Sequence, residues 1–212
     1  MAAVLLVAVS GFGVAGRTAA AAEARTGDFT RQDTSRTRLR VALAGNEARY
    51  IVNEQLAGRP LRNDAVGATT AVTGQLLLDG RGRFVADSSA LTIDLTTLKT
   101  DQERRDNYVR RRTLQVEQFP TAVLVPRELR GLPWPLPASG QHTFQLVGDL
   151  TLHGVTRPSV WDVTGTFNGN RLTGTARTQF KFADFNMEIP RLAFVLSVQD
   201  SIRLEYDFAF ER

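Results

Sequence analysis

Apolar and polar residues alternate with a period of two over most of the chain from residue 49 to the C-terminus. This alternation is typical of β-strands that bury one face and expose the other. The longest run lies near the C-terminus, where every second position from Ile202 to Phe210 is apolar or aromatic. The other apolar positions with this period are Tyr50, Val52 and Leu56; Val72, Leu76 and Leu78; Leu91, Ile93 and Leu95; Phe144, Leu146, Leu150 and Leu152; Trp161, Val163 and Phe167; and Leu172, Phe180 and Phe182.

Three segments interrupt the strand pattern. Residues 100–115 are charged and lack Gly and Pro, which predicts a short helix, and Thr100 with Glu103 forms a capping box at which it can begin. Residues 126–141 are rich in Pro and Gly and predict a loop rather than a strand. Asn168 to Asn170 separates two alternating runs and predicts a hairpin turn.

These elements amount to about eight or nine strands and one short helix, which predicts an all-β, antiparallel fold. An antiparallel sheet with one apolar face must cover that face, and closing into a β-barrel also removes the exposed edges. The same strands also suit a sandwich of two sheets. Periodicity alone does not choose between the two architectures.

The N-terminal segment predicts export. Residues 2–16 are apolar and small, and the alanines that follow provide a cleavage site near Ala22, so residues 1–22 are predicted to be a signal peptide. The alternative is an alanine-rich disordered tail. Residues 23–47 are polar and aperiodic and predict a flexible linker, with the β domain over residues 48–212. We therefore expect a secreted or periplasmic protein with no membrane span after the leader.

Composition excludes several kinds of site. The chain has no cysteine and two histidines, so disulfides and cysteine-based metal sites are excluded and no metal site is expected. The net charge is +4, and the aromatic residues are not interleaved with a basic run, so nucleic-acid binding is not expected. Asp149 and His153 lie on one strand face, but four residues span roughly 13 Å, too far for a catalytic hydrogen bond. We therefore expect no enzyme activity.

Three blocks resemble the YceI-like family over most of the chain from residue 50 to residue 210. They are Arg105-Asp106 followed by Gln118-Phe119-Pro120, the block Gly148–Arg157, and Phe182–Ile189 with Val198–Leu204. Asn186 departs from the family pattern, which usually has Gly there. The resemblance implies an extended, lipocalin-like barrel with a helical insertion, and it favours the barrel over the sandwich. It also implies secretion and a long isoprenoid or quinone-type ligand inside the barrel.

The candidate ligand site is the apolar interior, for which the alternative is an ordinary filled core. The expected lining residues are Leu91, Ile93, Phe144, Leu146, Trp161, Val163, Phe180, Phe182, Phe194, Tyr206 and Phe208. Arg105 and Arg110 on the helix, together with His153, are candidates for binding the ligand's head group. The planar guanidinium of arginine can donate two hydrogen bonds to one phosphate group. The alternatives are a solvated helix face for the arginines and a turn-fixing hydrogen bond for His153.

Two functions of different classes follow from this reading. The first is an exported lipid-binding protein that holds a long apolar ligand and needs no cofactor. The second is a non-catalytic envelope or stress-related module with a filled barrel. The assembly to be tested is a homodimer that pairs through exposed strands.

Overall fold

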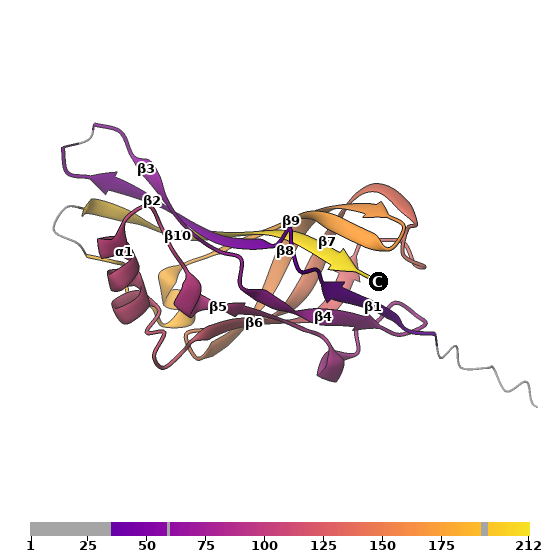
Figure 1. The fold of residues 1–212 in the computed structure, drawn as a ribbon. Coiled ribbons are helices and arrows are strands. Elements are labelled where there is room, and N and C mark those ends of the chain that lie inside the picture. The colour runs from indigo at the N-terminus through magenta and orange to yellow at the C-terminus, as the bar shows by residue number, and fades with distance from the viewer. Residues whose placement is uncertain (1–34, 59, 192–194) are drawn as a thin grey trace, which may run out of the picture. The chain divides into compact units, whose positions relative to one another are not determined.

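The computed structural model describes residues 35–212, apart from residue 59 and residues 192–194. Ten strands alternate along the chain with one short α-helix and several single helical turns (Figure 1). The strands are β1 Thr37–Val41, β2 Glu47–Leu56, β3 Asn63–Thr69, β4 Val72–Leu78, β5 Ala90–Asp94, β6 Thr121–Arg130, β7 Ser139–Leu152, β8 Val155–Asn168, β9 Arg171–Phe180 and β10 Val195–Glu211. The helical elements are the α-helix α1 Glu103–Tyr108, the π-helical turn η3 Val109–Thr113, and the 3₁₀ turns η1 Ala86–Ser88, η2 Leu95–Thr97 and η4 Phe182–Phe185.

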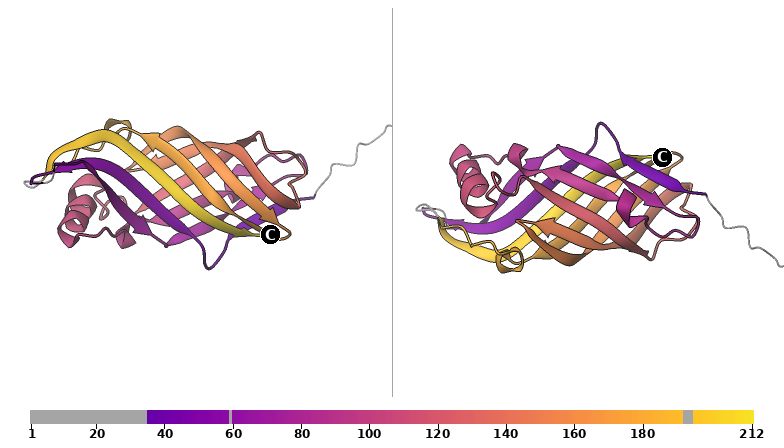
Figure 2. Two further views of the ribbon diagram at one scale, coloured as in Figure 1. Left: turned by 90° about the horizontal axis from the view of Figure 1, so that it is seen from above. Right: turned by 90° about the horizontal axis from the view of Figure 1, so that it is seen from below.

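The strands form one antiparallel sheet that closes on itself. Their order is β1-β4-β5-β6-β7-β8-β9-β10-β2-β3, and β1 also pairs with β10, so eight strands form a ring. The strands run obliquely around this barrel (Figure 2), as closure of a sheet requires. The predicted all-β barrel of about eight antiparallel strands with one short helix is confirmed.

The remaining hairpin, β2–β3, continues the barrel wall at one end. β10 is 17 residues long, and it pairs with β2 over most of its length and with β1 only at its C-terminal end. The hairpin therefore extends beyond the ring next to α1 (Figure 1). No helix within the described ranges has the length and apolar character that crossing a bilayer requires.

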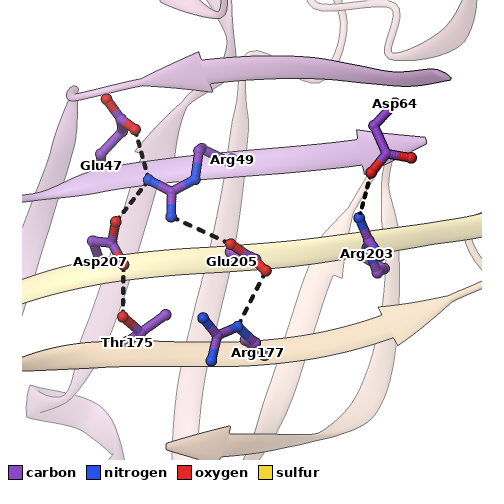
Figure 3. A network of polar contacts seen from close by, with 8 residues as sticks. All are labelled: Glu47, Arg49, Asp64, Thr175, Arg177, Arg203, Glu205 and Asp207. Carbon is purple, nitrogen blue, oxygen red and sulfur yellow. Dashed lines mark hydrogen bonds and ion pairs between the residues drawn. The ribbon is translucent and has the colours of Figure 1, made fainter. Parts of the chain in front are cut away.

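A polar network covers the outer face of β9, β10 and β2 (Figure 3). Arg49 contacts three carboxylates: Glu47 at 2.6 Å, Asp207 at 2.7 Å and Glu205 at 3.3 Å. Glu205 also accepts a hydrogen bond from Arg177 at 3.1 Å, and Asp207 accepts one from Thr175 at 2.7 Å. Farther along β10, Arg203 pairs with Asp64 of β3 at 2.8 Å. These pairs join four neighbouring strands, β9, β10, β2 and β3, on the side opposite the apolar core.

Three local predictions are wrong. The segment Thr37–Val41 lies in the predicted flexible linker but forms β1, which closes the ring. Pro126 lies inside β6, because the register shifts between Pro126 and Glu128 and a bulge tolerates the missing N–H; only the segment between β6 and β7 is a loop. The helix has no capping box at Thr100: it begins after Gln102, and the Thr100 hydroxyl donates to Asp106 at 2.7 Å instead.

The first 34 residues lie outside the described part of the chain, so the signal peptide over residues 1–22 stays a prediction. The predicted hairpin after β8 is confirmed, because β8 ends at Asn168 and β9 begins at Arg171.

Candidate ligand-binding cavity

The inward faces of the barrel strands enclose an elongated apolar space. Its volume is about 200 Å³. A single water molecule needs roughly 10–15 Å³ of such space, so the interior is far from filled by side chains. Its walls come from every strand of the ring and from the helical segment that follows η2. An apolar lining with few polar groups is the usual character of a site for a lipid chain.

The apolar residues expected from the sequence are brought together in this lining. Those that line the cavity are Leu91, Ile93, Phe144, Leu146, Trp161, Val163, Phe180, Phe182, Tyr206 and Phe208. Phe194 lies outside the described residues. Contact of any of them with a ligand stays a prediction.

One end of the cavity is closed by the loop between β6 and β7. Leu132 and Leu136 of this loop line the cavity, and Trp134 between them donates a hydrogen bond to the Gly80 carbonyl at 2.9 Å. That bond fixes the loop to the turn between β4 and β5. The side chains of this loop that line the cavity are apolar.

The helix end of the cavity is different, because a buried ion pair lies in its wall. Nη2 of Arg105 lies 2.7 Å from Oε1 of Glu54, and each side chain is only 5% exposed. Arg105 also contacts Asp101 through Nη1. The neighbouring Asp106 carboxylate is buried and accepts hydrogen bonds from the Thr100 N–H and hydroxyl, which hold the start of the helix against the barrel.

Tyr50 lines the same region from β2. Its partner across the β2–β3 pair is Gly67, and a Cβ at that position would collide with the Tyr50 ring. The absence of a side chain at Gly67 therefore leaves room for the Tyr50 ring to lie over β3. Burial raises the pKa of the Tyr50 phenol, while the charge of Arg105 opposes part of that rise, so the hydroxyl is protonated at neutral pH.

The other two candidates for head-group binding lie apart from the cavity lining. Arg110 is half-buried on η3, and its Nη1 lies 3.4 Å from the Thr96 carbonyl oxygen. His153 lies in the two-residue turn between β7 and β8, where both His153 and Gly154 have positive φ. Its Nδ1 is 3.1 Å from the Phe185 carbonyl oxygen, and its ring meets that of Phe119 edge-on at 4.7 Å. This geometry matches the turn-fixing alternative.

Comparison with known proteins identifies the family. The sequence profile described as the YceI-like domain matches residues 49–210. The chain belongs to the YceI-like family. Sequence relatives include a UPF0312 protein of Pseudomonas syringae pv. tomato, 34% identical over 97 residues, which are 43% of this chain and 46% of that protein. A UPF0312 protein of Pseudomonas putida is 29% identical over 53% of this chain and 62% of its own length. The matched region thus spans about half the length of these relatives.

Solved structures share the YceI-like fold. A polyisoprenoid binding domain from Saccharophagus degradans has a TM-score of 0.64 and 14% identity, covering 82% of this chain and 97% of that one. BcnA of Burkholderia cenocepacia has a TM-score of 0.58 and 18% identity, covering 80% and 98%. At these identities the likeness establishes the fold of this YceI-like chain and nothing further.

The sequence reading of this YceI-like chain missed the polar end of its cavity. Glu54 and Thr113 line the cavity, and Glu54 pairs with Arg105, but neither was a candidate. A signal for Glu54 was present: it occupies an even position of β2, on the face that carries Tyr50 and Val52. A carboxylate on an otherwise apolar strand face requires a buried cationic partner. Nothing in the sequence indicates that this partner is Arg105, because the two residues are 51 positions apart.

Proposed function

We propose that this protein is an exported lipid-binding protein that holds a long apolar ligand, isoprenoid or quinone-type, inside its barrel. The observation that carries the proposal is the apolar cavity enclosed by the ring of strands. Burial of a hydrocarbon chain there gains roughly 25 cal/mol per Å² of apolar surface removed from water. The shared fold with a protein described as a polyisoprenoid binding domain supports the same ligand class.

The proposed role is binding without a chemical step. The Asp149 carboxylate is paired with Arg127 at 2.5 Å, and the His153 ring is held by the Phe185 carbonyl. Each therefore has a local structural partner. Within the described residues no cluster of three or more His, Asp and Glu side chains is arranged to hold a metal ion.

The alternative function is an envelope module with a filled barrel. It requires an interior that side chains occupy, and the cavity volume argues against it. The two functions differ in one measurable property, which is lipid that stays with the purified protein.

The test is organic extraction and mass spectrometry of protein purified without detergent. We expect about one isoprenoid-type lipid per barrel in the wild type. Ala176→Phe is expected to lose most of it, because Ala176 lines the cavity and a phenyl ring there takes up chain volume. Gln179→Phe on the exposed face of the same strand is the matched control and should keep its lipid. Equal lipid in both variants, or none in a wild type expressed in its own host, would contradict the proposal.

Export belongs to the proposal as well, and its support is the apolar, small-residue run over residues 2–16 followed by alanines. Cell fractionation of the full chain tests it, with a chain that begins at residue 23 as the control. We expect the full chain in the periplasm or medium, shortened near residue 22, and the control in the cytoplasm. Homodimer formation stays a prediction.

A further inference from the structure

Three large apolar side chains are exposed at the end of the barrel that carries α1, where the β2–β3 hairpin and the start of β10 extend beyond the ring (Figures 1 and 2). Leu61 in the turn between β2 and β3 is 78% exposed, Leu196 near the start of β10 is 67% exposed, and Ile189 before β10 is 39% exposed. Ile189 and Leu196 line one groove. Arg62 joins the hairpin turn to this groove, because it donates to the Ser197 hydroxyl at 3.4 Å. Leu61, Ile189 and Leu196 therefore form one surface, here called the apolar tip.

The groove at the apolar tip lies against the ligand cavity. Pro190, Val195 and Val198 line both the groove and the cavity, so a single layer of side chains separates the two. The strand ladder is also incomplete here. β10 pairs with β9 only from Ile202 onward, and among the described strands its first residues pair with β2 alone. The apolar tip thus borders the side of the cavity that the β9–β10 ladder does not close.

The helical segment beside the apolar tip is basic. Residues 103–113 contain five arginines and two acidic residues, a net charge of +3, whereas the whole chain has +4. The segment meets the groove at the Tyr108 hydroxyl, which accepts from the Arg191 N–H at 3.2 Å. The exposed charged residues of this segment are Glu103, Arg104, Arg111 and Arg112. Most of the net positive charge of the chain therefore lies on one segment next to an exposed apolar surface.

An apolar surface next to exposed cations suits the surface of an anionic lipid bilayer. Apolar side chains enter the acyl region while arginines contact the lipid phosphates, and the two contributions add. A stable protein partner needs a complementary area of roughly 800 Å² on each side. A hairpin turn that projects beyond the barrel offers little such area, but it needs no complementary shape to enter a bilayer.

We propose that the end of the barrel that carries α1 docks on the surface of an anionic lipid bilayer. Leu61, Ile189 and Leu196 enter the acyl region, and the exposed arginines of residues 103–113 contact the lipid phosphates. Docking places the incomplete side of the ladder at the bilayer, so a long apolar ligand need not cross water to reach the cavity. The inference goes beyond the proposed ligand binding, because docking needs no ligand in the cavity.

The test is sedimentation of the purified full chain with lipid vesicles. One set of vesicles contains equal parts of phosphatidylcholine and phosphatidylglycerol, and the other contains phosphatidylcholine alone. We expect binding to the anionic vesicles to be about tenfold tighter, and to weaken at high salt because exposed charges are screened. All variants share the same residues 1–34, so differences between variants report the barrel alone.

The apolar contribution is tested by the double variant Leu61→Ser with Leu196→Ser. We expect it to weaken binding to anionic vesicles about tenfold, because it removes apolar surface that leaves water on docking. Leu43→Ser is the matched control. Leu43 is fully exposed in the loop between β1 and β2, at the opposite end of β2 from the hairpin turn, and its loss should change binding by less than about twofold.

The contribution of charge is tested by the double variant Arg104→Gln with Arg111→Gln, which we expect to weaken binding about tenfold. Arg38→Gln with Arg40→Gln removes the same charge from the exposed face of β1, away from α1 (Figure 1). This control should bind within about twofold of the wild type.

The outcomes separate docking from the proposed function. Equal losses in the two arginine pairs, or unchanged binding by the double leucine variant, would overturn docking through this surface. A wild type that ignores the vesicles but forms a dimer, which the double leucine variant loses, would assign the apolar tip to a second copy of the chain. Lipid extraction from the same preparations is independent: a chain that retains lipid without binding vesicles refutes docking alone, and one that binds vesicles without retaining lipid refutes only the proposed ligand binding.

Discussion

The buried ion pair between Arg105 and Glu54 contributes to the stability of the protein at the helix end of the barrel. Arg105 and Glu54 are each 5% exposed, so removing Glu54 leaves a buried guanidinium whose remaining carboxylate partner, Asp101, is largely exposed. Glu54→Ala should lower the free energy of unfolding by about 3 kcal/mol. Glu128→Ala is the control, because its pair with Arg130 is exposed and should contribute less than about 1 kcal/mol. Urea unfolding measures both, and equal losses in the two variants would show that the buried pair has no special weight.

At the same scale, the sequence predicts the apolar lining well and the polar end poorly. The lining follows from the period of two, because a strand fixes the direction of each inward side chain that it carries. Phe182 is the exception, since it lines the cavity from η4 and not from a strand. The position of Glu54 beside Arg105 depends instead on how the segment after η2 folds back over the barrel. That placement involves contacts between distant parts of the chain, which a local pattern does not contain.

At the scale of elements, the charge network on β9, β10 and β2 should make stability depend on pH. The hydrogen bond from Arg49 lowers the pKa of Asp207, with burial opposing and Thr175 adding to the effect. Burial also opposes a lowered pKa of Glu205, but hydrogen bonds from Arg177 and Arg49 outweigh it. Carboxyls with a lowered folded-state pKa stabilise the protein above their unfolded pKa of about 4, and this stabilisation is lost as pH falls through the folded pKa.

We therefore expect wild-type stability to drop from about pH 5 to about pH 3 more steeply than that of Arg49→Gln, in which these shifts are reduced. Arg130→Gln, which touches only an exposed pair, should follow the wild type. Urea midpoints at several pH values measure the difference. Parallel pH curves for wild type and Arg49→Gln would show that the network does not couple to folding.

The boundaries of β1 and β6 also show where the local sequence pattern no longer suffices to predict a strand. Pro126 indicates a loop by its chemistry, yet the strand continues through it because a bulge places the residue where no N–H is needed. β1 alternates Leu39 and Val41 with Arg38 and Arg40, but five residues are too few to stand out from the polar segment before them. Its existence depends on two long-range partners, β4 and β10.

At the scale of the whole molecule, β1 decides whether the sheet is a closed barrel or an open one. It pairs with β4 on one side and with the end of β10 on the other. The seam is reinforced by Ala42, whose N–H donates to the Ala209 carbonyl at 2.8 Å. Asn46 donates to the Ala42 carbonyl at 2.8 Å and accepts from the Ala209 N–H at 3.1 Å. Without β1, the edges of β4 and the end of β10 would be exposed.

A chain that begins at residue 43 should therefore bind lipid poorly, although the family match covers only residues 49–210. A chain that begins at residue 35 keeps β1 and is the matched control. We expect the control to retain the lipid and the thermal midpoint of the full chain, and the shorter chain to lose the lipid and to unfold at a lower temperature. Both are measured by extraction with mass spectrometry and by circular dichroism. If the shorter chain still holds lipid, the apolar cavity does not depend on closure of the ring by β1.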